Sequence, residues 1–339
     1  MNASASFKLG RRSLCTLGTA ALAALLPLLS PSPVNAAEGV EEAPSKWINR
    51  MHTAVVRKNY QGTLVRMRGT QVETFKVYHR QVGDNVSERL VGMDGDGFEV
   101  IQKDGETLCI FPAQQSVVVE NSNSEVKSPM AAGLPAYDPA LEGSYRFSVE
   151  EEGRVADRSC RALQIAAIDE YRYGYRIWID TGSGMPLKSQ LLSSNGKELI
   201  EEVMFTDIQI LDEVPTELIQ SAHNTENFSR VMPDEAPEGK DVDMPGWKAA
   251  ELPPGFTLKT VRQEFLMGKD EPRLHLVYMD GLASVSVFVD KRGDEDREGF
   301  DMMGPTNAYT VFHDDWMVTA VGQVPPVTVE MIAGGMQQQ

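Results

Sequence analysis

The stretch of sequence that decides the fold is residues Tyr171–Leu192, YRYGYRIWIDTGSGMPLKSQLL. Its first ten residues alternate strictly between two sides, which is the period of a β-strand. The Thr-Gly-Ser-Gly segment that follows contains residues able to adopt positive φ, and the chain then returns from Pro186 in a second alternating run. This pattern predicts an antiparallel hairpin. One face of its first strand carries Tyr171, Tyr173, Tyr175, Ile177 and Ile179.

The composition is typical of a soluble globular protein. The chain has 339 residues, of which 42% are apolar and 24% are charged. This length is sufficient for two domains that each bury a core. The formal net charge of −17 argues against a nucleic-acid-binding protein, which needs clustered basic side chains.

The N-terminus has the pattern of a secretion signal. Three basic residues precede an apolar segment, Leu14–Leu29, which is short for a membrane-spanning helix and is interrupted by Pro27. Small residues then place the cleavage site after Ala36 or Ala37. Residues 1–36 are therefore expected to be a signal peptide, and the mature chain to be exported into the periplasm.

The mature chain keeps two of the three cysteines, Cys109 and Cys160. Two cysteines in an oxidising compartment are a natural pair, so a disulfide between them is expected. The alternative is two buried thiols that do not react with each other.

The first part of the mature chain is predicted to form one helix followed by a β-meander. Ser45 is expected to cap a helix that runs to about Lys58 and carries one apolar stripe. Roughly ten alternating runs separated by turn residues follow as far as Leu211. Within them, residues 121–144 break the rhythm, and their spaced apolar residues predict a flap or a short helix over the sheet. Together these patterns predict a half-open β-barrel wrapped on helices, which can hold a ligand.

The rest of the chain is predicted to form a linker and a smaller domain. Residues 221–245 are polar, acidic and rich in proline, whereas 246–333 contain further antiparallel strands and a last helix. We therefore expect an α+β protein, mainly antiparallel β, with domains at 37–220 and 246–333 and a tail at 334–339.

No pattern in the sequence predicts catalysis. The five histidines are scattered, and neither metal-ligand spacing nor a Gly-x-Ser-x-Gly nucleophile motif occurs. Asp94–Gly97 resembles the start of a calcium loop, but Gly105 stands at the twelfth position, where a bidentate Glu is needed. We expect no catalytic residue, no metal and no cofactor, and hence a protein that is not an enzyme.

Several short motifs occur in order along the chain. In the first half they are Asn59–Thr63 (NYQGT), Arg154–Ala156 with Cys160, Tyr171–Asp180 and Pro186–Ser189. In the second half they are Leu252–Phe256 (LPPGF), Asp280–Phe288 (DGLASVSVF), Thr306–Tyr309 (TNAY) and Val318–Pro325. Jointly they resemble the MucB/RseB regulators of envelope stress. Pro305, directly before Thr306–Tyr309, departs from that pattern, and the departure affects only the expected conformation of its loop.

The resemblance implies an N-terminal domain like the lipoprotein carriers and a smaller C-terminal domain. It implies binding to the periplasmic segment of a single-span anti-sigma factor of the RseA/MucA type, which shields that segment from the site-1 protease and so restrains the sigma factor. It further implies release by lipid or lipopolysaccharide. The alternative is a periplasmic lipid or lipoprotein carrier.

Two sets of residues are candidates for these contacts. For the partner we select Tyr309 and Trp316, near the edge of the second domain. For an apolar lipid-binding cavity the candidates are Met130, Leu134, Tyr137, Tyr171, Tyr173, Tyr175, Ile177 and Ile179. An ordinary core is the alternative for each cavity residue, and the alternation does not say which strand face points inward. Homo-oligomerisation also stays open.

Overall fold

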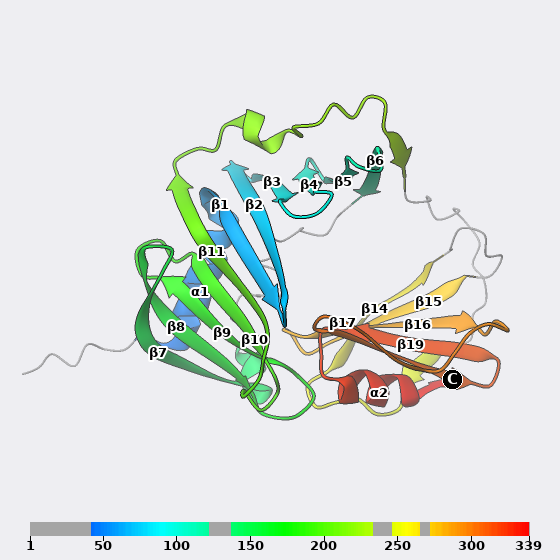
Figure 1. Cartoon of the computed structure of the whole chain (residues 1–339). Helices are drawn as coiled ribbons and strands as arrows, with labels where there is room; N and C mark the ends of the chain where they lie inside the picture. Colours follow the sequence, from blue (N-terminus) through cyan, green and yellow to red (C-terminus); the bar gives the residue numbers. More distant parts are fainter. Residues whose placement is uncertain (1–41, 122–136, 233–245, 265–271, 339) are drawn as a thin grey trace, which may run out of the picture. The chain divides into compact units, whose positions relative to one another are not determined.

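The computed structural model describes residues 42–121, 137–232, 246–264 and 272–338 (Figure 1). The chain from Glu41 to Gln339 forms one compact unit. The expected signal peptide and the flap residues Met130 and Leu134 lie outside the described residues. None of the helices within these ranges combines the length and the apolar character needed to cross a membrane.

The larger sheet has twelve strands, in the order β12-β6-β5-β4-β3-β2-β1-β11-β10-β9-β8-β7. All described pairings are antiparallel except that of β12 with β6. Because β12 and β7 end the order, the sheet stays open, and the expected mainly antiparallel α+β fold with a half-open first sheet is confirmed (Figure 1). The strands are β1 Asn59–Arg68, β2 Gln71–Val82, β3 Asn85–Gly92, β4 Phe98–Lys103, β5 Glu106–Phe111, β6 Ser116–Asn121, β7 Tyr145–Val155, β8 Arg158–Ala167, β9 Gly174–Asp180, β10 Pro186–Leu192, β11 Leu199–Leu211 and β12 Ser229–Val231. Short 3-10 helices occupy Pro139–Gly143 (η1) and Thr216–Ile219 (η2).

Helix α1, Pro44–Arg57, buries the apolar stripe that the sequence predicts. Trp47, Ile48 and Met51 pack into one core cluster with Ile177 and Ile179 of β9. The helix begins differently from the prediction, because Ala43 is the N-cap and Pro44 occupies the first turn. Proline suits this position, since its missing N–H has no partner in the first turn. The predicted cap at Ser45 is therefore wrong.

The smaller sheet has six strands, in the order β14-β15-β16-β19-β18-β17. Helix α2, Pro326–Gly334, contacts β18 and β19, and its buried Val329 and Ile332 join the core of this sheet. The strands are β14 Thr257–Glu264, β15 Arg273–Met279, β16 Ser284–Lys291, β17 Gly299–Met303, β18 Thr306–His313 and β19 Trp316–Gly322. Two short strands, β13 Trp247–Ala249 and β20 Met336–Gln338, pair with each other. The sequence reading missed β13, β17 and β20.

The hairpin of β9 and β10 forms as expected, but β9 begins at Gly174 and not at Tyr171. Asp169 explains the later start. Its carboxylate accepts hydrogen bonds from the Tyr171 N–H at 3.0 Å and from Arg172 Nε at 2.9 Å, which holds residues 169–172 in a turn. Gly174 then approaches the carbonyl of Ile165, which a Cβ at this position would meet at 3.0 Å. Tyr171 and Tyr173 therefore do not belong to the strand face.

The expected disulfide is not formed. Cys109 lies on β5 and Cys160 on β8, and seven strands separate these two in the sheet order. Both residues are thiols, Cys109 half-buried and Cys160 buried. Burial raises the pKa of the Cys160 thiol, and the nearby charge of Asp180 adds to this shift. The oxidising compartment favoured a disulfide between the two cysteines, but the order of strands in the sheet keeps their side chains apart.

Candidate functional site

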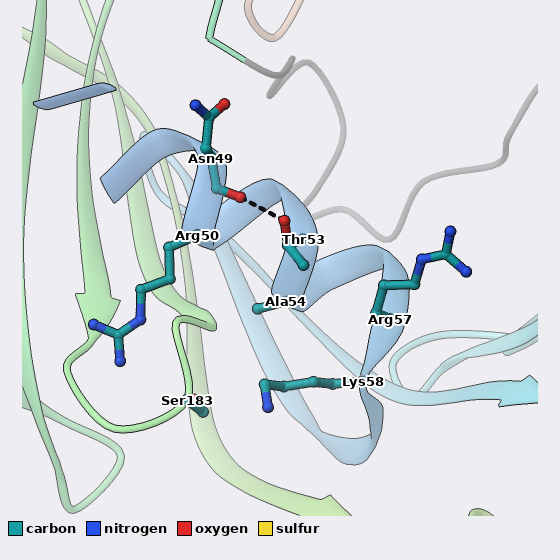
Figure 2. Close-up of a pocket in the computed structure, with 7 residues that line it drawn as sticks. All are labelled: Asn49, Arg50, Thr53, Ala54, Arg57, Lys58 and Ser183. Atoms are coloured by element: carbon teal, nitrogen blue, oxygen red, sulfur yellow. Dashed lines mark hydrogen bonds between the residues drawn. The ribbon is translucent and has the colours of Figure 1, made fainter. Parts of the chain in front are cut away.

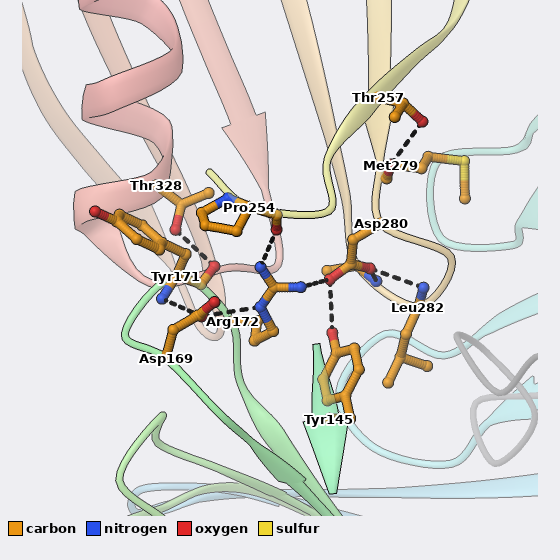
Figure 3. Close-up of polar contacts among 11 residues, drawn as sticks. Tyr145, Asp169, Tyr171, Arg172, Pro254, Thr257, Met279, Asp280, Leu282 and Thr328 are labelled. Carbon is orange, nitrogen blue, oxygen red and sulfur yellow. Dashed lines mark hydrogen bonds and ion pairs between the residues drawn. The ribbon is translucent and has the colours of Figure 1, made fainter. Parts of the chain in front are cut away.

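A buried arginine lies where the turn before β9 contacts two loops of the C-terminal half (Figure 3). The side chain of Arg172 is 0% exposed. Its Nε binds Asp169 at 2.9 Å, one Nη binds Asp280 at 2.5 Å, and the other donates to the carbonyl of Pro254. The cation thus joins a turn of the first half to the loop before β14 and to the β15–β16 turn.

Asp280 is the second centre of this cluster and is likewise 0% exposed. Besides Arg172, it accepts hydrogen bonds from Tyr145 Oη at 3.0 Å, the Leu282 N–H at 2.9 Å and the Ala283 N–H at 2.7 Å. Burial and the Asp280 charge raise the pKa of Tyr145, so its hydroxyl stays a donor. A buried carboxylate with this set of donors is fully hydrogen-bonded.

Aromatic rings and a glycine complete the surroundings of Arg172. The guanidinium lies 5.5 Å from the centroid of Tyr145 and 5.3 Å from that of Phe256, within the range of cation–π attraction. Gly255 has φ of +82°, and a Cβ there would lie 2.6 Å from Ser144 Oγ. Only glycine combines this backbone conformation with this approach.

The two tyrosines beside Arg172 make contacts of the same kind. Tyr173 Oη accepts a buried hydrogen bond from Asn307 Nδ2 at 3.0 Å, and Asn307 also donates to the carbonyl of Val324 at 2.8 Å. Thr328 Oγ1 donates to the carbonyl of Tyr171 at 2.7 Å (Figure 3). These two candidate cavity residues thus contact β18 and α2.

The remaining described cavity candidates lie together. Ile177 and Ile179 are buried in the cluster that contains Trp47 and Met51 of α1, and Tyr137 and Tyr175 pack against it partly buried. Tyr137 Oη also donates to Glu142. The structure thus joins four of the eight candidates in one apolar cluster under α1, whereas their role towards a lipid stays a prediction.

An open groove of about 440 Å³ runs along the exposed side of α1 (Figure 2). Arg50 donates to the carbonyls of Thr181 and Gly182, and Arg57 lies 3.5 Å from Asp84. With Lys58, these side chains give an acidic protein a local cationic surface. The sequence reading missed it, because the helix and the β9–β10 turn meet only in the fold. The lining residues are Asn49, Arg50, Thr53, Ala54, Arg57, Lys58 and Ser183.

The two residues selected for partner binding lie on neighbouring strands of the smaller sheet. Tyr309 on β18 is half-buried, and its ring lies 4.4 Å from that of Phe300 on β17. Trp316 on β19 packs edge-to-face on Trp247 at 6.1 Å, with Lys291 Nζ 4.1 Å above its ring. Trp316 is directly opposite His313, four residues along β18 from Tyr309, and both candidates pack, partly buried, against the core cluster of the smaller sheet.

No group of three His, Cys, Asp or Glu side chains within the described ranges could hold a metal ion.

Comparison with known proteins identifies relatives along nearly the whole described chain. The MucB/RseB N-terminal domain matches residues 43–223, and the MucB/RseB C-terminal domain matches residues 241–337. The sigma factor AlgU regulatory protein MucB of Pseudomonas aeruginosa is 32% identical over 296 residues, covering 85% of this chain and 89% of that protein. The sigma-E factor regulatory protein RseB of Escherichia coli K12 is 25% identical, covering 84% of this chain and 88% of its own.

Solved structures agree with this relationship. The crystal structure of MucB in complex with MucA(peri) matches with a TM-score of 0.68 and 30% identity, covering 88% of this chain and 99% of that chain. The crystal structure of MucB matches with a TM-score of 0.60 and 29% identity, covering 87% of this chain and 98% of that chain. Family motifs, both domain matches and the fold therefore agree, and the chain belongs to the MucB/RseB family of sigma factor regulatory proteins.

Proposed function

We propose that this chain is a periplasmic negative regulator of an envelope-stress sigma factor. It binds the periplasmic segment of a membrane anti-sigma factor and shields that segment from the site-1 protease. Lipid or lipopolysaccharide from a damaged envelope releases the complex. The observation that carries the proposal is the match over 88% of this chain to MucB in its complex with MucA(peri).

The proposed organisation has an exported chain with two functional parts. Residues 1–36 act as the signal peptide, 37–220 as the lipoprotein-carrier-like domain, and 246–333 as the C-terminal domain. The linker at 221–245 contains the short strand β12, which pairs with β6 of the larger sheet. Separate core clusters on the larger sheet and on the smaller sheet support this division. The Arg172 cluster supports a working unit in which the two parts act together, because it joins loops of both.

The lipid signal is proposed to act at the apolar cluster under α1. Ile177, Ile179, Tyr175 and Tyr137 contribute to this cluster, which packs against the helix. An acyl chain entering there would have to displace Trp47 and Met51 from the strand face. That movement would change the surface offered to the protein partner, which couples lipid binding to release.

The test is direct binding between two purified proteins. Titration of residues 37–339 into the periplasmic segment of the cognate anti-sigma factor should give a saturable heat signal in calorimetry. Vesicles containing lipopolysaccharide should then dissociate the complex, whereas vesicles of phosphatidylcholine alone should not. Absence of binding, together with transfer of lipid cargo to an acceptor protein, would instead indicate a carrier.

A further inference from the structure

The outer edge of the smaller sheet is an exposed apolar strand. All five residues of β17, Gly299–Met303, are exposed. Met302 and Met303 are 76% and 77% exposed, more than the other exposed large apolar side chains of the described chain, and Phe300 is 52% exposed. β17 pairs with β18 and is the last strand in the sheet order, so no described strand pairs with its outer side.

The opposite edge of the same sheet is different. β14 also carries exposed apolar side chains, Leu258 and Val261, but Lys259 and Arg262 alternate with them. Charged side chains, lysine above all, are the usual protection of an edge strand against pairing with another chain. β17 has only Asp301 for this purpose. The edge at β17 is therefore the less protected of the two.

The side chains of β17 continue the covered face of the sheet. Phe300 is directly opposite Tyr309, and Met302 is directly opposite Asn307. Residues opposite each other in an antiparallel pair point to the same face. Tyr309 packs against the core that contains α2, and Asn307 is only 4% exposed. Phe300 and Met302 thus extend the core-facing side beyond the last strand, where an added strand would cover them.

The chain that leads into β17 defines the charge of the occupant. Residues 294–301 contain five carboxylates and a single basic residue, Arg297. Asp294, Glu295, Glu298 and Asp301 are exposed. Extended peptides that add to a sheet edge gain affinity from backbone hydrogen bonds and specificity from alternate side chains. A segment with alternating apolar residues and flanking lysine or arginine fits this edge.

We propose that β17 is a docking edge for an extended, basic and apolar segment of the anti-sigma factor, which adds to the smaller sheet as a seventh strand. This inference rests on the proposed function for the identity of the partner. Apolar side chains of the segment cover Phe300 and Met302, while its basic residues face the carboxylates at 294–301. The backbone of β17 supplies the hydrogen bonds.

The test compares two edges of one sheet. Met302→Lys places a repelling charge on β17, and Val261→Lys makes the same kind of change on β14, where the side chain is 54% exposed. Both variants should fold, because both side chains are exposed in the free protein. Met302→Lys should weaken binding of the anti-sigma segment at least tenfold, or about 1.4 kcal/mol, and Val261→Lys should leave it within a factor of two.

Two further measurements test the mode of binding. Amide hydrogen exchange at 299–303 should slow when the segment is added, while 257–264 should be unchanged. Asp294→Asn with Glu295→Gln should lower the association rate, and added salt should lower the rate for the wild type more than for this variant.

The outcomes separate the inference from the function on which it rests. Undiminished binding by folded Met302→Lys, with wild-type binding intact, overturns the docking edge and leaves the proposed function standing. Absence of wild-type binding overturns both. If Met302→Lys instead converts a wild-type dimer to a monomer without weakening segment binding, β17 pairs with a second copy of this chain, and the proposal is wrong.

Discussion

Removal of the buried cation at Arg172 gives the sharpest test of how the two sheets are joined. Arg172→Met keeps much of the side-chain volume but leaves Asp280 buried without its cation. Breaking a buried ion pair in this way typically costs about 3–5 kcal/mol of unfolding free energy. Three other donors remain on Asp280, from Tyr145, Leu282 and Ala283. We therefore expect a loss near the lower end, about 3 kcal/mol.

The assay is urea denaturation followed by tryptophan fluorescence. Trp47 and Trp178 report on the larger sheet and its helix, while Trp247 and Trp316 report on the smaller sheet. Replacing one pair at a time by phenylalanine separates the two signals. In the wild type both signals should change in one transition, whereas in Arg172→Met the smaller sheet should unfold separately.

The control is Arg66→Met, because Arg66 forms a 2.8 Å ion pair with Glu73 on partly exposed strands. Its loss should cost about 0–1 kcal/mol and leave the transitions coincident. The double variant Arg172→Met, Asp280→Asn should lose less unfolding free energy than its two single variants lose together, since no buried charge is then unpaired. A cost below about 1 kcal/mol for Arg172→Met alone, with coincident transitions, would refute the coupling role.

Further predictions concern titration, thiols and backbone conformation. Burial lowers the pKa of His79 below its ordinary 6.5 despite a hydrogen bond to the Lys58 carbonyl. As the pH is lowered, His79 therefore takes up a proton in the unfolded chain before it does so in the folded protein. The free energy of unfolding should fall below pH 6.5 by up to about 1.4 kcal/mol per pH unit. His79→Phe should flatten this slope, measured as unfolding free energy between pH 8 and pH 5; an equal slope in both proteins would refute the assignment. Cys160 should react slowly with a thiol reagent in the native protein, and both cysteines of the 37–339 chain should react in unreduced urea-unfolded protein, whereas a count of no free thiols would restore the disulfide. Gly255→Ala should cost about 1–3 kcal/mol, because its φ of +82° and the Ser144 contact both oppose a Cβ; the same change at exposed Gly143, where a Cβ meets nothing within 4 Å, is the control.

Local pattern was sufficient for much of the fold. The stripe of α1 and the β9–β10 hairpin follow from residues adjacent in sequence, and the structure contains both. Each depends on side-chain period and backbone preference, which a single segment carries. The family motifs supplied the assignment of function, because composition and spacing alone indicated only an exported binding protein.

The interface of the two sheets could not be predicted in the same way. Strict alternation extended the strand to Tyr171 and placed Arg172 on the face opposite the tyrosines. A turn organised by the carboxylate of Asp169 overrides that alternation, and the resulting arginine is buried by loops more than 80 residues away. A charged residue becomes fully buried only when distant partners satisfy it, and no local pattern reveals those partners. The strand β17 was missed for a different reason, since its alternating pattern is limited to Phe300, Asp301 and Met302 and is too short to predict a strand.

Shielding of an anti-sigma factor from proteolysis is the activity that we propose for this chain. It is tested most directly by the rate at which the site-1 protease cleaves the periplasmic segment of the cognate anti-sigma factor, with and without saturating 37–339 protein. We predict that cleavage slows at least about tenfold, because only the small unbound fraction of the segment is open to the protease, and that it recovers when lipopolysaccharide is added. An unchanged cleavage rate at saturating protein would contradict the proposed shielding.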